Sequence, residues 1–226
     1  MNQCKNAPLV EAIFEIRFPV ELSIESGKDK YYEKIRDKFP QVFIPKTATS
    51  EAYALEPYQF KNVEETEIIR FSINKFSFIT QKYSSFCEFK QKCLDYMNSF
   101  FELYKISILK RTGLRYINHI PISKEGEFIP LEKYLTFGYK LPNTISNKFS
   151  MLSSEFVTKI EDGKLRTFIQ YEREPEETIL LDFDYFLEKE LVSSKISEYL
   201  EKSHYRTKEI FLSLITEEYK KIMEGD

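Results

Sequence analysis

Two arginines and a histidine recur on one strand in the middle of the chain. Residues 108–120 read as a β-strand, and alternation along a strand places Arg111, Arg115 and His119 on the same side. Arginine forks bind carboxylate or phosphate groups bidentately, and a histidine adds a donor that titrates near neutral pH. The sequence therefore predicts a face that binds a small anionic ligand or a protein partner.

A first strand, at residues 9–18, carries Glu11, Glu15 and Arg17 on the side opposite its apolar face. If it neighbours the mid-chain strand, its two glutamates meet the two arginines across the ladder. One interpretation is then a network of exposed ion pairs, each worth roughly a few tenths of a kcal/mol. The other is a binding site, for which the candidate residues are Arg111, Arg115, His119, Glu15 and Arg17.

Three carboxylates suggest a different chemistry. Asp182 and Asp184 lie two apart on a predicted strand and point the same way, and Glu155 is expected on the same sheet face. Such oxygens suit a hard divalent cation, so a metal-dependent hydrolase or nuclease is the alternative function. Such an enzyme usually has a Lys or His in a set position near its metal ligands, and none is evident from the spacing of this sequence. The sequence therefore favours a non-catalytic binding or regulatory protein, with no cofactor and no metal, over an enzyme.

The sequence gives little support for a catalytic cysteine or histidine. Cys87 and Cys93 lie on a predicted helix stripe that faces the core, which is a poor place for a reactive thiolate. Together with Cys4 they match neither a disulfide framework nor a zinc spacing, and they indicate a reducing compartment. His204 follows Ser203, the expected start of the last helix, and reads as a capping or surface residue.

The composition is that of an ordinary folded protein. The 33 basic and 36 acidic residues give a net charge of -3, which argues against a nucleic-acid binder, and 6 glycines leave little room for phosphate-binding loops. No apolar run approaches the ~18 residues of a membrane span, and no apolar leader opens the chain. We expect a cytoplasmic protein without membrane or nucleic-acid partners.

The predicted elements follow the order β-α-β-β-β-α twice. The first set comprises residues 9–18, 28–39, 52–60, 67–73, 75–81 and 86–104. The second set comprises residues 108–120, 130–137, 149–160, 164–173 and 177–185, then helices at 193–200 and 203–223. This order predicts an α+β fold, with a continuous, curved, mostly antiparallel sheet and long helices packed on one face. Its two duplicated, intimately packed halves are 1–105 and 106–226. Open sheet edges and 35 Phe and Tyr residues add a self-associating subunit, such as a homodimer, as a third class.

Four segments resemble a family of bacterial and archaeal proteins of similar length. They are APLVEAIFEIRF at residues 7–18, RTGLRYINHI at 111–120, LDFD at 181–184, and residues 204–218. The family is sporadically distributed and has no assigned activity. This resemblance implies genes that move between genomes, as in defence or toxin–antitoxin islands, and it supplies no catalytic residue.

Overall fold

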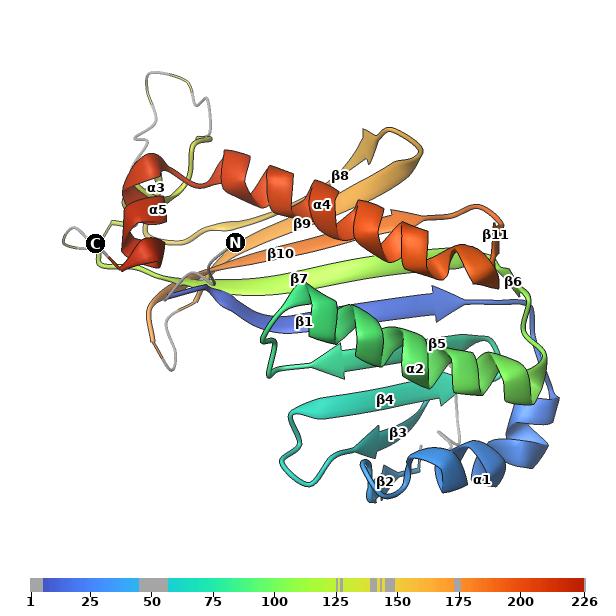
Figure 1. Ribbon diagram of the computed structural model, residues 1–226. Coiled ribbons are helices and arrows are strands. Elements are labelled where there is room, and N and C mark those ends of the chain that lie inside the picture. Colours follow the sequence, from blue (N-terminus) through green and yellow to red (C-terminus); the bar gives the residue numbers. More distant parts are fainter. Residues whose placement is uncertain are drawn as a thin grey trace. The chain divides into compact units, whose positions relative to one another are not determined.

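The computed structural model describes residues 6–44, 57–124, 126, 128–138, 142, 144, 149–172 and 176–225. Its strands are β1 (Leu9–Arg17), β2 (Gln41–Phe43), β3 (Tyr58–Lys61), β4 (Glu67–Ser72), β5 (Lys75–Thr80), β6 (Ile108–Leu109), β7 (Arg111–Pro121), β8 (Ser153–Ile160), β9 (Gly163–Glu172), β10 (Thr178–Leu187) and β11 (Leu191–Val192). Its helices are α1 (Ser23–Ile35), α2 (Phe86–Tyr104), α3 (Leu131–Tyr134), the short 3-10 helix η1 (Ser193–Lys195), α4 (Ile196–Leu214) and α5 (Glu217–Glu224). Figure 1 labels these elements.

Nine strands of the described residues form one mostly antiparallel sheet, in the order β2-β3-β4-β5-β1-β7-β10-β9-β8, and β11 pairs with β6. The predicted α+β class is therefore confirmed. β1 and β7, the first long strands of the two predicted halves, are neighbours near the middle of this order, as expected. That the halves are duplicates of one another stays a prediction.

The chain divides into two compact units, each assembled from separate stretches. Unit 1 comprises Met1–Val10, Tyr116–Tyr185 and Ser203–Asp226, and unit 2 comprises Glu11–Arg115 and Phe186–Lys202. This division differs from the predicted halves 1–105 and 106–226, which follow element order. Strands β1, β7 and β10 and helix α4 each contribute residues to both units.

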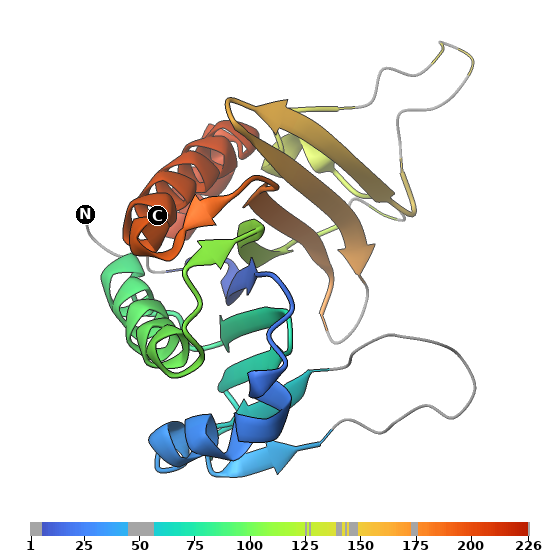
Figure 2. The same cartoon turned by 90° about the vertical axis from the view of Figure 1, so that its right-hand side faces the viewer.

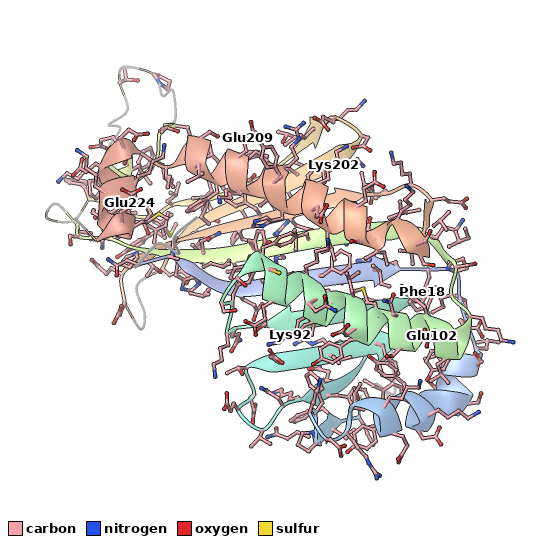
Figure 3. All side chains as sticks on the ribbon, viewed as in Figure 1. Phe18, Lys92, Glu102, Lys202, Glu209 and Glu224 are labelled. Atoms are coloured by element: carbon pink, nitrogen blue, oxygen red, sulfur yellow. The ribbon has the colours of Figure 1, made fainter. Side chains whose placement is uncertain are left out.

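The core of unit 2 lies between its sheet and two helices. Helix α2 begins at Ser85, whose hydroxyl accepts a hydrogen bond from the amide of Glu88 (3.2 Å), and ends at Lys105, which has a left-handed backbone. Helix α2 covers the same sheet face as α1, as Figures 1 and 2 both show. Phe100 and Tyr31 bring the two helices together, with ring centroids 5.1 Å apart. Polar contacts flank this core: on α2, Lys92, labelled in Figure 3, places its Nζ 2.7 Å from Glu67.

The residue pairs Asn74-Lys75 and Asp162-Gly163 predict two tight hairpins, and both hairpins are confirmed, but each turn lies one residue earlier than the pair that predicts it. In β4–β5 the last paired residues are Ser72 and Lys75, so Lys75 belongs to the ladder and not to the turn. In β8–β9 the last paired residues are Ile160 and Gly163, and Glu161 takes the positive φ of 51°. The glycine that signalled this turn is thus the first residue of β9.

Several predicted boundaries were wrong. The strand expected at 108–120 is two strands: β6 pairs with β11, β7 belongs to the nine-stranded sheet, and between them the amide of Lys110 donates to the carbonyl of Arg17 (2.7 Å). The helix expected at 28–39 starts earlier, at Ser23. Strand β3 overlaps the end of the strand expected at 52–60. Residues 52–56 and 173, at the ends of predicted strands, lie outside the described residues.

The break predicted at Ser203 was also wrong. Ser203 is fully buried in the middle of α4, and its carbonyl accepts a hydrogen bond from the hydroxyl of Thr207 (2.8 Å). These small polar residues continue the buried stripe begun by Ile196 and Leu200, so a residue that suits a helix cap instead fills a tight packing position. The chain breaks later, where the hydroxyl of Thr216 caps α5.

Candidate functional site

The predicted contact between the first strand and the mid-chain strand is present in unit 2. Glu15 on β1 accepts hydrogen bonds from Nη1 of Arg111 (3.2 Å) and Nε of Arg17 (3.0 Å), and its second oxygen lies 2.9 Å from Nζ of Lys75. We name Glu15, Arg17, Lys75 and Arg111 the Glu15 cluster. One carboxylate thus contacts three cations, which come from three neighbouring strands.

Alternation places the cluster on the sheet face opposite the helices. Phe14 and Ile16, on either side of Glu15, are fully buried, and Phe14 packs against Tyr199 of α4. Pairing continues the row outward from Glu15 to Ser77 on β5 and Arg70 on β4. No described helix of unit 2 covers this side of its sheet, which we call the open face.

Arg70 adds a further cation to the open face. Its Nε donates to the side-chain oxygen of Gln59 (3.2 Å), its direct neighbour on β3. In the part of the chain that the structure describes, no ion pair involves Arg70. Because Gln59 is neutral, no described carboxylate compensates the positive charge of Arg70.

Burial and charge oppose one another at Glu15. Burial alone raises the pKa of the Glu15 carboxyl, but the hydrogen bond from Lys75 and the charges of Lys75, Arg17 and Arg111 outweigh it, so its pKa lies below the usual value. Arg111 is the most buried of the three cations, with 14% of its side chain exposed, and its guanidinium lies 4.6 Å from the ring centroid of Phe186. The carboxylate thus stays charged and holds the cations in place.

The other predicted binding residues are placed as follows. Arg115 is half-buried on β7 in unit 2, four residues from Arg111 and on the same side of the strand. Glu11, expected opposite Arg115, accepts a hydrogen bond from the side chain of Gln81 (3.0 Å). His119 belongs to unit 1, where its Nε2 lies 3.9 Å from a carboxylate oxygen of Glu172. The structure thus brings together Glu15, Arg17 and Arg111 of the predicted set.

The acidic residues of the alternative prediction surround an arginine. Asp182 is buried in unit 1, and its carboxylate lies 3.0 Å from Nη1 of Arg166, whose Nε lies 2.7 Å from Glu155. Asp184 follows two residues later on the same side of β10. Among the described residues, no group of three or more His, Cys, Asp or Glu side chains is placed to hold a metal ion. The guanidinium of Arg166 supplies the cation that these acids were expected to take from solution.

Lys75, Arg166 and Phe186 were not predicted as site residues, although two of them left a signal. Counting residues through the β4–β5 hairpin places Lys75 opposite Arg17 once the turn is centred on Ile73 and Asn74. Parity along the strand at 177–185 places Phe186 on the side of Asp182. The role of Arg166 depends on the register of β8 against β9, which the sequence does not fix.

His204 is neither a cap nor a surface residue. It lies in α4 of unit 1, with its Nδ1 2.9 Å from the hydroxyl of Tyr116 on β7. Burial and the nearby charge of Lys208 lower the pKa of His204 to about 4. The ring is therefore neutral at pH 7.

We expect the free energy of unfolding of the wild-type protein to fall as the pH drops from 6.5 towards 4. In the His204→Gln variant this fall should be smaller by about 1–2 kcal/mol. A histidine whose folded pKa lies below its unfolded value stabilises fully above the unfolded pKa, and this contribution is lost as the pH falls towards the folded one. Partial exposure of the ring reduces the effect. Urea denaturation of both proteins at several pH values measures it. Parallel pH profiles for the two proteins would contradict the assignment.

The two cysteines that the structure describes, Cys87 and Cys93, lack the surroundings of a nucleophile. Cys93 is fully buried in α2, and this burial raises the pKa of its thiol well above the usual range. Cys87 is exposed on the same helix, contrary to the expected core position. Cys4 lies outside the described residues.

Among the described residues, no helix combines the length and the apolar character that crossing a membrane requires. A comparison with protein-family models and with curated proteins finds no match to this chain.

Proposed function

We propose that this protein is a non-catalytic binding protein, and that the open face of unit 2 holds an anionic group of a small ligand or of a protein partner. The surplus of positive charge in the Glu15 cluster is the observation that supports this most. Arg17 and Lys75 share the Glu15 carboxylate, and neither takes part in another ion pair of the described residues, so one acid serves these two cations. A bound carboxylate or phosphate would neutralise the rest.

The cluster is also preorganised for such a ligand. Glu15 and the Phe186 ring hold Arg111, so its side chain loses little freedom on binding. Arg17 and Lys75 are more exposed, with 53% and 32% of their side chains accessible, and their remaining donors can reach a ligand from solvent. The resemblance described above adds the proposal that the partner belongs to a defence or toxin–antitoxin system.

Calorimetric titration with inorganic phosphate and with a glutamate-rich peptide tests the proposal. We expect at least one of these probes to bind with an affinity that falls as salt is raised, and the double variant Arg17→Gln, Lys75→Gln to weaken binding about tenfold or more. The matched control is Lys30→Gln, Lys34→Gln, which removes the same charge from exposed positions of α1. Equal losses in both double variants would reduce the effect to net charge and overturn the site.

Absence of binding by both probes would leave no anion specificity to explain, and it would contradict an anion site on this face. If a probe does bind, purification from the native cell with the wild-type chain as bait, and with the Arg17→Gln, Lys75→Gln chain as control, identifies the natural partner. A partner retained equally by both baits would lie elsewhere on the molecule.

A further inference from the structure

Among the residues that the structure describes, strand β8 of unit 1 is an open edge of the sheet. It stands last in the order of the sheet, and none of its eight residues is buried. Phe156 and Val157 are 40% and 55% exposed. A long exposed edge with apolar side chains offers unpaired amide and carbonyl groups to another strand.

The two-residue turn after β8 fixes which of its backbone groups face outward. Ile160 and Gly163 flank the turn, and in a hairpin of this length the flanking residues exchange hydrogen bonds with one another. Counting back from Ile160, every second residue turns its amide and carbonyl towards β9. Those of Glu155, Val157 and Lys159 therefore point away from the sheet.

We propose that two copies of this chain associate through β8, with the two strands antiparallel and Val157 of each copy opposite Val157 of the other. In this register Glu155 of each copy faces Lys159 of the other, so two opposite-charge pairs flank the two-fold axis. Glu155, Val157 and Lys159 each donate and accept one backbone hydrogen bond across the interface.

Charge complementarity favours this register over its neighbours. It also favours β8 of a second copy as the strand that pairs here. Shifting the axis to Thr158 places Glu155 opposite Glu161, and shifting it to Phe156 leaves both charges opposite uncharged residues. Lys159 takes part in no ion pair of the described residues, and Glu155 keeps 51% of its side chain exposed beside Arg166. The strand is thus complementary to itself.

Two charge reversals test the pairing by sedimentation velocity over a wide concentration range at low salt. Lys159→Glu gives an edge with two acids, and Glu155→Lys gives an edge with two bases. Each variant alone should dimerise about tenfold or more weakly than the wild type, because both cross-strand pairs become repulsive. Mixing the two variants should restore dimers of wild-type affinity, since every acid then faces a base.

Mixing the two variants also distinguishes charge repulsion from misfolding. Misfolded chains would not form dimers when mixed, whereas folded chains with complementary edges would. Lys30→Glu, the same charge change at an exposed position of α1, is the control and should dimerise like the wild type. A wild-type chain that stays monomeric throughout overturns the proposal. So do single variants that dimerise as tightly as the wild type, or a mixture that associates no better than its components.

Discussion

Replacing Phe100 by alanine should lower the free energy of unfolding by about 3–5 kcal/mol, a large part of the stability of an ordinary domain. Phe100 is fully buried in unit 2. The rings of Tyr31, Phe71 and Phe76 lie 5.1, 5.4 and 4.8 Å from its own, measured between centroids. Because these rings come from a helix and two strands, they cannot move together to fill the cavity. Urea denaturation followed by circular dichroism measures the loss.

A truncation at an exposed position shows how much of this loss comes from core packing and how much from shortening any side chain. Val63 is 74% exposed in the same unit, and Val63→Ala should change the free energy of unfolding by no more than about 0.5 kcal/mol. Phe100→Leu, which keeps most of the volume, should fall between the two. If Phe100→Ala cost no more than Val63→Ala, the aromatic cluster would not be the core of this unit.

Replacing Arg166 by methionine should destabilise the protein by about 2–4 kcal/mol, because it removes the guanidinium that lies 3.0 Å from the buried Asp182 carboxylate. Only 2% of the Asp182 side chain is exposed, so water cannot take over the solvation of its charge. Methionine keeps much of the apolar stem of Arg166, which limits the loss of packing. The measurement is again the denaturation midpoint, taken at neutral pH.

A double-mutant cycle assigns this cost to the charge. Asp182→Asn removes the buried charge, so adding Arg166→Met to it should cost less than in the wild-type background. The ion pair between Arg166 and Glu155 is half-exposed, so Glu155→Gln should have an effect below about 1 kcal/mol. Strict additivity of the two substitutions at residues 166 and 182 would show that they do not interact.

Period-two patterns in the sequence predicted much of the fold and part of the candidate site. The apolar alternation of the first strand placed Glu15 on the polar side, and alternation around Arg111 placed the guanidinium to meet it, as the 3.2 Å contact bears out. Strand parity is a local property, and the buried face of each strand is visible in its own residues.

The features that the sequence did not predict depend on non-local packing. Ser203 has the chemistry of a helix cap, but the packing of α4 gives it a buried position that the sequence alone does not reveal. The pairing of Lys75 with Glu15 depends on a hairpin register that shifts with a single residue in the turn. The proximity of Arg166 to Asp182 depends on the neighbours of β9 in the sheet, and contacts of that kind join residues far apart in the chain.

The interleaved division of the chain has a consequence for its synthesis. Unit 2 opens with Glu11 but is complete only with the stretch that ends at Lys202, and unit 1 needs the helices that follow. A ribosome-bound intermediate cannot finish either unit until residue 202 has emerged. A premature stop codon upstream of that stretch therefore truncates both units at once, and an amino-terminal fragment ending at residue 105 lacks part of unit 2.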